Sequence, residues 1–338
     1  MIKRYGRGEG MEGTGLVLSG GGAKGGYQAG VMEKLHELGL LEGLSGISGD
    51  SIGAVNAAIY MQGVEKLSAI WKEMKKKLMM QIDTDALSRA DHLMSRTEID
   101  KLLEQFVDET LFDKDSPVCY CGVSRGPAGI TGEDLISEER LIRFLGSRSM
   151  DEFKDFTAEY ISLNHKSKQE ICDILRATTC LPFIFEPVRM GDHWYIDGGV
   201  KDNIPVRPLY DAGIRRFIVI ECDTKSHLKQ ENFPDAEFIV ITASHDLGDF
   251  ITGTIDFNQR DIQFQYAMGK KDAERAQKTK FEKDEAYIAM EEKLAEMDYA
   301  LLKKEQRDAE TMKNLSRSVN KHMDKFSSIE EKYKLWDD

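Results

Sequence analysis

The first sixty residues alternate between short apolar runs and helix-like segments, and glycine-rich turns separate them. Residues 15–19, GLVLS, predict a short buried strand that ends at three glycines. A helix is expected from about Gly26 to Leu38, because its apolar side chains fall on one face. A second apolar run, residues 44–48, leads into a tight turn and another helix-compatible segment. This alternation predicts an α/β domain with a largely parallel sheet.

Later segments continue the same pattern. Further strands are expected at residues 117–124, 156–163, 193–197, 216–222 and 237–242. Further helices are expected at residues 97–107, 138–146, 168–178 and about 255–272.

After about residue 275 the composition changes. Residues 280–326 contain neither Gly nor Pro and are rich in Glu, Lys, Ala, Met and Leu, which predicts helix. Met290, Leu294, Met297 and Leu301 form one apolar stripe along it. We expect a solvated amphipathic helix that packs on the preceding domain, with a dimerising helix or a lid as the alternatives.

Charge and cysteine content limit the classes of partner. The formal net charge of −13 argues against general nucleic-acid binding, which needs a basic face. The five cysteines include no C-x-x-C pair, as expected for free thiols in a reducing compartment. Cys119 and Cys121, without a second pair of ligands, make a weak metal site. The N-terminus has no apolar signal segment, and no run approaches the length of a spanning helix. A cytoplasmic location is the resulting expectation.

The turn after the first expected strand reads SGGGAKGG, residues 19–26, and matches G-x-G-x-x-G. One interpretation is a dinucleotide site, with pyrophosphate on the helix N-terminus and Asp50 as the ribose-binding acid. Another is an oxyanion hole, in which successive main-chain N–H groups stabilise developing negative charge. A purely structural role is the third, although consecutive glycines usually mark a close backbone approach. The loop alone leaves these interpretations open.

The second turn reads GDSIG, residues 49–53, which is the G-x-S-x-G arrangement of a nucleophile elbow between a strand and a helix. The Ser51 hydroxyl would lie near a helix N-terminus, where an anionic centre is stabilised. An N-capping serine is the plainer alternative. A nucleophile needs a base, and His245 is the most attractive histidine by position. The α/β-hydrolase order fits poorly, however, because an elbow at Ser51 leaves room for a single strand before it.

A third pattern is HWYIDGGVKDNIPV, residues 193–206. Residues 194–196 predict a short strand, and Asp197 follows at its carboxyl end, where open α/β sheets place their chemistry. The two glycines after Asp197 would let the backbone bend so that the carboxylate faces a neighbouring turn. An ordinary Asp-Gly turn is the alternative.

These three patterns, in this order, resemble the patatin-like phospholipase family. RATTCLPFIFEPV, residues 176–188, is similar to the family's segment that leads toward the aspartate, and DNIPV, residues 202–206, to the piece after it. Residues 244–273 are similar to the family's closing helical region. The resemblance covers most of residues 14–275, which we expect to form an acyl hydrolase domain, and leaves residues 276–338 as a charged helical extension.

The resemblance implies a three-layer α/β/α sandwich with a mostly parallel central sheet, and a Ser-Asp dyad that uses no histidine. Ser51 would be the nucleophile and Asp197 the general base, with Gly49 and Gly53 in the elbow. No metal and no cofactor are implied. The main-chain N–H groups of the glycine loop would form the oxyanion hole, at Gly20, Gly21, Gly22, Ala23 and Lys24.

Two positions depart from the family's commonest pattern. Asp50 stands where a small hydroxyl residue is common, and a carboxylate there should repel a developing oxyanion if it points inward. Val200 follows the Asp-Gly-Gly turn, where a polar residue is often seen. Neither departure removes an essential group, and both bear on rate and substrate preference.

The resulting hypothesis is a serine acyl hydrolase of lipid metabolism that cleaves acyl esters of phospholipids or lysophospholipids. The alternative is a catalytically weak lipid-binding or scaffold protein that keeps the fold. The expected partners are a lipid or acyl ester substrate and no nucleic acid. Residues 71–80, WKEMKKKLMM, either contact a membrane surface transiently or form a solvated helix end. The C-terminal helices offer a route to a homo-oligomer.

Overall fold

The computed structural model describes part of the 338-residue chain. The described residues are 13–73, 81–82, 94–95, 97–112, 116–135, 153–248, 253–254, 259–294, 296–297, 304, 307–308 and 311–314. The chain divides into two compact units, Met1–Phe281 and Glu282–Asp338.

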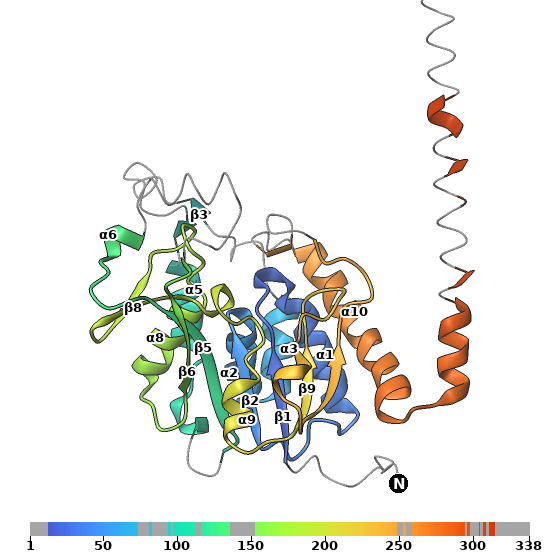
Figure 1. The fold of residues 1–338 in the computed structure, drawn as a ribbon, viewed down its shortest axis with the longest axis horizontal. Coiled ribbons are helices and arrows are strands. Elements are labelled where there is room, and N and C mark those ends of the chain that lie inside the picture. The colour runs from blue at the N-terminus through green and yellow to red at the C-terminus, as the bar shows by residue number, and fades with distance from the viewer. Residues whose placement is uncertain are drawn as a thin grey trace, which may run out of the picture. The chain divides into compact units, whose positions relative to one another are not determined.

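An eight-stranded sheet forms the centre of the first unit, in the order β10-β9-β1-β2-β5-β8-β7, with β6 paired to β5 (Figure 1). The run from β10 to β5 is parallel, whereas β6, β7 and β8 pair antiparallel. The prediction of a mostly parallel central sheet is therefore confirmed. The strands are β1 (Thr14–Leu18), β2 (Gly46–Asp50), β5 (Val118–Arg125), β6 (Thr157–Ser162), β7 (Val188–Met190), β8 (His193–Asp197), β9 (Arg216–Ile220) and β10 (Glu237–Ile241). A separate two-stranded sheet pairs β3 (Gln81–Ile82) with β4 (Met94–Ser95).

Helices connect these strands. The α-helices of the first unit within the described residues are α1 (Gly25–Glu37), α2 (Ile52–Tyr60), α3 (Val64–Glu73), α5 (Thr97–Phe106), α6 (Gly132–Leu135), α8 (Lys168–Thr178), α9 (Arg207–Asp211) and α10 (Gln259–Ala276). Short 3-10 turns lie at η1 (Gly22–Lys24), η3 (Glu109–Phe112), η5 (Gly198–Val200) and η6 (Gln230–Asn232), and a π-helical segment, η8 (Gln277–Phe281), follows α10. The predicted helix at 168–178 coincides with α8, whereas the one predicted at 138–146 lies outside the described residues.

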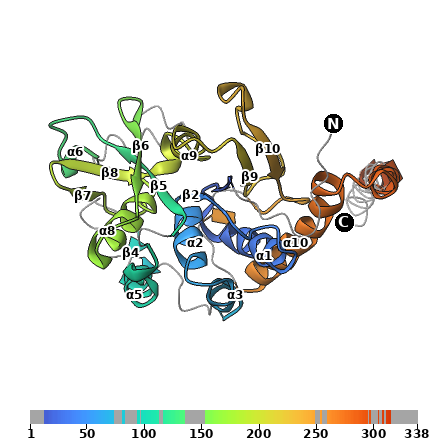
Figure 2. The ribbon, with the colours of Figure 1, turned by 90° about the horizontal axis from the view of Figure 1, so that it is seen from below.

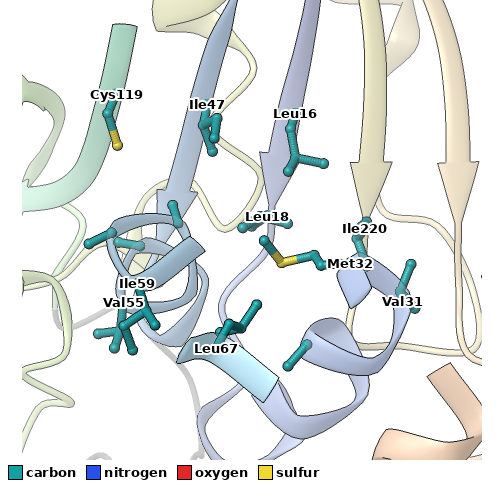
Figure 3. Close-up of a cluster of buried hydrophobic side chains, with 14 of the residues drawn as sticks. Leu16, Leu18, Val31, Met32, Ile47, Val55, Ile59, Leu67, Cys119 and Ile220 are labelled. Atoms are coloured by element: carbon teal, nitrogen blue, oxygen red, sulfur yellow. The ribbon is translucent and has the colours of Figure 1, made fainter. Parts of the chain in front are cut away.

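The sheet lies between two layers, with α1, α2, α3 and α10 on one face and α9 on the other (Figure 2). Side chains alternate along β1, as expected for a strand covered on both faces. Leu16 and Leu18 pack in the core with Met32 of α1 and Leu67 of α3 (Figure 3). Val17 packs in a second core with α9. Both faces of the sheet are therefore apolar, and this fixes the layered architecture.

Strand β5 decides where the ends of two other strands meet. Along one edge it pairs β6, and along the other it pairs β2 with its first half and β8 with its second. Because β2 runs parallel to β5 and β8 antiparallel, the two strands approach each other end to end. Asp50 ends β2 opposite Gly122, and Asp197 ends β8 opposite Val123. The last residues of β2 and β8 are thus brought together although they are far apart in sequence.

The second unit contains helix at residues 285–294. Of the predicted apolar stripe, Met290 and Leu294 are each 47% exposed and Met297 is 60% exposed, and Leu301 lies outside the described residues. The packing, dimerising and lid interpretations of this stripe stay predictions.

Candidate active site

The turn between β2 and α2 holds Ser51 in an unusual backbone conformation, with φ 50° and ψ −125°. A residue with a side chain reaches positive φ only at an energetic cost, and such strain clusters at functional sites. The neighbouring glycines give the chain room for this turn. A Cβ on Gly49 would lie 2.5 Å from the main chain of Gly53, and a Cβ on Gly53 would lie 2.5 Å from Leu18 O. Both glycines are therefore required by crowding and not by their φ angles.

Ser51 and Asp197 meet at the junction of β2 and β8. The Ser51 hydroxyl donates to Asp197 Oδ2 at 2.7 Å. The two side chains belong to residues that are only 7% and 2% exposed, so water screens their interaction little. Both predicted site residues are thus in direct contact, in the geometry that a hydroxyl and its proton acceptor require.

The turn after β8 fixes the Asp197 carboxylate. The carboxylate Oδ1 accepts the Gly199 N–H at 2.9 Å, and the main-chain N–H of Asp197 donates to Cys180 O at 2.8 Å. The first glycine after it has no room for a side chain, because a Cβ on Gly198 would lie 1.8 Å from Asp50 Oδ1. The Asp-Gly-Gly sequence therefore orients the Asp197 carboxylate and lets the main chain pass close to the Asp50 carboxyl group.

Thr178, at the end of α8, supports the elbow and was not identified from the sequence. Its Oγ1 accepts the Ser51 N–H at 2.8 Å and donates to Gly122 O at 2.6 Å. The same oxygen lies 3.2 Å from Asp50 Oδ1. Thr178 lies within the segment that resembles the family, but nothing in RATTC distinguishes a supporting threonine from an ordinary one.

Asp50 is fully buried. Burial and, after it, the charge of Asp197 raise the pKa of Asp50 well above its usual range, although the Thr178 hydroxyl and the Ser51 main chain act the other way. The dinucleotide interpretation needs Asp50 to reach a ribose, and a fully buried carboxyl does not. That alternative is therefore wrong for Asp50.

The glycine loop joins β1 to α1 beside this pair. The Gly20 N–H donates to Asn203 O at 3.3 Å, and the Lys24 N–H donates to Gly21 O at 3.2 Å. Gly22 has φ +58°, and a Cβ there would lie 2.1 Å from Thr254 O. The Gly20 end of the loop is therefore bonded to the segment at Asn203, whereas the Lys24 N–H closes a turn within the loop. The middle of the loop passes close to the main chain of Thr254.

A cavity of about 230 Å³ contains Ser51 and Asp197. The glycine loop forms one wall, and the polar side chains of Lys24, Glu221, Asp223 and His227 also line the cavity. Of the loop, Gly20, Gly21 and Gly22 line the cavity, and the remaining lining residues are Ser19, Leu181, Gly199, Val200, Asn203, Cys222 and Thr254. Ala23, which was expected in the same loop, is buried with 1% exposure.

Two other side chains that line the cavity could in principle act as a nucleophile or as a base, Cys222 and His227. Burial raises the pKa of the Cys222 thiol to about 12, so the thiol stays protonated near neutral pH. His227 lines the cavity, but its Nε2 pairs with Asp223 Oδ2 at 3.0 Å. The sequence drew attention to His245 instead, and its Nδ1 contacts the hydroxyl of its neighbour Ser244. The acceptor at the Ser51 hydroxyl is an aspartate.

The proposed membrane-contact stretch is partly corrected. Trp71 is 2% exposed and donates from Nε1 to Asn56 Oδ1 at 2.8 Å, so it presents no aromatic face to a lipid surface. The three lysines at 75–77 lie outside the described residues. In the part of the chain that the structure describes, no helix combines the length and the apolar character needed to cross a membrane.

Several known proteins are similar to part of this chain. An uncharacterized NTE family protein of Mycobacterium tuberculosis is 24% identical over 191 residues, which are 56% of this chain and 27% of that protein. Lysophospholipase NTE1 of Cryptococcus neoformans is 26% identical over 230 residues, which are 66% of this chain and 12% of that protein. The chain therefore spans a small part of the curated relatives it matches.

Two solved structures are also similar. VipD from Legionella pneumophila aligns with a TM-score of 0.42 and 14% identity, over 78% of this chain and 66% of that one. The type III effector protein ExoU aligns with a TM-score of 0.31 and 16% identity, over 78% of this chain and 52% of that one. The sequence profile described as patatin-like phospholipase matches residues 16–210, which include the end of β1, the elbow and the Asp-Gly-Gly turn. The chain belongs to the patatin-like phospholipase family.

Proposed function

We propose that the protein is a serine acyl hydrolase that cleaves acyl esters of phospholipids or lysophospholipids through a Ser51–Asp197 dyad. The observation that carries the proposal is the 2.7 Å hydrogen bond from Ser51 Oγ to Asp197 Oδ2 beside the glycine loop. The lipid class is supported by the family and by the name of one relative, a lysophospholipase. Because that relative is matched over 12% of its length, the substrate is part of the proposal.

In the first half-reaction Asp197 Oδ2 takes the proton of Ser51 Oγ while that oxygen attacks the ester carbonyl carbon. A tetrahedral intermediate forms, with negative charge on the former carbonyl oxygen. When it collapses, the bond to the leaving alcohol breaks, and the proton on Asp197 passes to the alcohol oxygen. The products of this stage are the free alcohol and an acyl ester on Ser51.

In the second half-reaction water replaces the alcohol. Asp197 takes a proton from the water as its oxygen attacks the acyl carbon, and the proton then returns to Ser51 Oγ as the carboxylic acid leaves. The ionised aspartate is regenerated, so the cycle consumes one ester and one water. A positioned acid–base group of this kind contributes about 10²- to 10⁴-fold to the rate.

The glycine loop would hold the oxyanion. The proposed donors are the main-chain N–H groups of Gly21, Gly22 and Ala23, because those of Gly20 and Lys24 already donate to other carbonyl groups. This narrows the five-residue expectation to the middle of the loop. The partial positive charge at the α2 N-terminus, directly after Ser51, would add to the stabilisation.

Covalent labelling with a fluorophosphonate probe tests the proposal. The probe should modify Ser51, identified by mass spectrometry of the labelled peptide, and Ser51→Ala should abolish the labelling. Ser244→Ala, which removes an exposed serine, is the matched control and should label normally. Folded protein that resists the probe would favour the lipid-binding alternative and reject the hydrolase.

A second assay on the same variants tests the substrate class. Release of fatty acid from lysophospholipid micelles, compared with hydrolysis of a short p-nitrophenyl ester, separates a lipid hydrolase from a general esterase. Activity on the short ester alone would contradict the lipid part of the proposal and keep the dyad.

A further inference from the structure

Asp50 lies where the elbow, the glycine loop and the Asp-Gly-Gly turn meet, and the mechanism above gives it no role. It is fully buried at the end of β2. A Cβ on Gly199 would lie 3.1 Å from Asp50 Oδ2, and a Cβ on Gly20 would lie 3.5 Å from the same oxygen. The carboxyl group therefore fills the space directly beneath both glycine turns, behind the Ser51–Asp197 pair.

The number of protons that Thr178 can donate decides which group donates to which. A threonine hydroxyl has one proton to donate and two lone pairs with which to accept. Its Oγ1 accepts the Ser51 N–H at 2.8 Å and faces Gly122 O at 2.6 Å. A carbonyl oxygen only accepts, so the hydroxyl proton is committed to Gly122 O.

The third neighbour of Thr178 is Asp50 Oδ1, at 3.2 Å. A proton donated by Thr178 to Asp50 would favour the carboxylate, but the single hydroxyl proton is already used at the shorter contact with Gly122 O. The contact therefore places an oxygen of Asp50 against a lone pair of Thr178. A carboxylate there would be repelled, whereas a carboxylic acid would donate its proton and complete the hydrogen bond. Asp50 Oδ2 has no hydrogen-bond partner within the described residues, which also disfavours a charge.

The charged groups around Asp50 favour the same state. Asp197 at the end of β8 and Asp202 after η5 are both acids, and both act on Asp50 to disfavour its ionisation. Burial is the main cause that raises the pKa of the Cys121 thiol of β5 and of the Tyr160 phenol of β6, so both of these neighbouring groups stay neutral. Burial adds the largest contribution in the same direction.

We propose that Asp50 is a neutral carboxylic acid that positions the nucleophile, by donating to Thr178 Oγ1 and so fixing the Ser51 main chain without placing a second negative charge beside Asp197. The positioning role rests on the proposed function, because it requires that Ser51 is the nucleophile. It explains how an acidic residue is tolerated next to an oxyanion site: the uncharged form does not repel the developing charge. Asp50 is a positioning residue, since it acts through Thr178 and Ser51.

Infrared difference spectroscopy tests the protonation without turnover. Unaltered protein near pH 7, compared with Asp50→Asn, should show the carbonyl band of a protonated carboxyl group that shifts on exchange into heavy water. The same band should be present in the Ser51→Ala background. A carboxylate band in its place would overturn the inference. If the band is present and the unaltered protein hydrolyses no ester, the proposed function fails and the protonation of Asp50 stands.

Kinetics test the positioning. Asp50→Asn keeps a neutral donor of the same shape and should hold kcat/KM within about threefold of the unaltered protein, whereas Asp50→Ala and Thr178→Val should each lower it by about 10- to 100-fold. Thr179→Val, which removes the adjacent hydroxyl that donates to Leu175 O, is the matched control and should leave kcat/KM unchanged. Asp50→Asn losing as much activity as Asp50→Ala would mean that the carboxylate itself is needed, and the inference would be wrong. Should Asp50→Ala fail to fold, the infrared comparison and the Asp50→Asn rate still decide the question.

Discussion

Ser51 Oγ lies 2.7 Å from Asp197 Oδ2, although 146 positions separate the two residues along the chain. The contact follows from the sheet, because β2 and β8 end opposite neighbouring residues of β5. Their last residues face each other across one strand edge, and the Ser51 turn follows directly. The candidate dyad is therefore a product of one parallel and one antiparallel pairing to the same strand.

The first prediction concerns the proton acceptor. Asp197→Asn keeps the shape of the side chain but cannot take the Ser51 proton, so we expect kcat/KM for ester hydrolysis to fall by about 10³-fold. His245→Ala should leave most of the activity, because the His245 ring contacts Ser244 and does not line the cavity. Steady-state assays of both variants check this. A loss in His245→Ala that matches the loss in Asp197→Asn would contradict the dyad.

The second prediction concerns crowding at the glycine loop. Gly22 and Gly191 have nearly the same positive φ, +58° and +59°, but a Cβ on Gly22 would lie 2.1 Å from Thr254 O and one on Gly191 meets nothing within 4 Å. Alanine at either position should cost about 1–2 kcal/mol of stability from backbone strain. Only Gly22→Ala should also displace the proposed oxyanion donors, and its kcat should fall at least about tenfold.

Thermal unfolding and ester hydrolysis, measured on both glycine variants, separate the two effects. Gly191→Ala reports the strain alone. Equal hydrolysis by the two variants would mean that the loop main chain near Gly22 does not contribute to catalysis.

Local sequence was enough to predict the strands and turns around Ser51, because apolar runs and paired glycines report local geometry directly. It was not enough to identify Thr178, whose contact with the Ser51 N–H spans 127 positions and depends on where α8 ends. Trp71 shows the opposite error: a lysine-rich neighbourhood indicated a surface, whereas tertiary packing buries the ring beside Asn56. Asp197 became a candidate base through the family resemblance, since its partner strand cannot be read from spacing.

The third prediction concerns a buried amide that links three helices. Asn56 Oδ1 accepts from Trp71 Nε1 at 2.8 Å, and its Nδ2 donates to Gly25 O and Gln28 Oε1, both at 3.1 Å. Asn56→Ala removes these three buried hydrogen bonds, and we expect it to lower the free energy of unfolding by about 2–4 kcal/mol. Gln62→Ala, at a half-buried position, should cost less than about 1 kcal/mol. Urea unfolding of both checks this, and equal costs would contradict it.

The fourth prediction follows from the raised pKa of Asp50, which burial and the charge of Asp197 cause. In the unfolded chain an aspartate loses its proton near pH 4, whereas the folded protein still holds it. The stability that this proton contributes is fully present below about pH 4 and is lost as the pH rises toward the folded pKa, by up to about 1.4 kcal/mol per pH unit. Asn has no such proton to lose. The unfolding free energy of Asp50→Asn relative to the unaltered protein should therefore increase as the pH rises.

Urea unfolding of the two proteins at about pH 4, 6 and 8 measures this difference, and the comparison cancels the contributions of all other carboxyl groups. The variant should match the unaltered protein most closely in acid and exceed it at the highest pH. A difference that stays constant, or one that comes to favour the unaltered protein as the pH rises, would mean that Asp50 is ionised in the folded state. In that case the fold would hold a charged carboxylate beside Ser51, and the Thr178 hydroxyl would donate to Asp50 Oδ1 in place of Gly122 O.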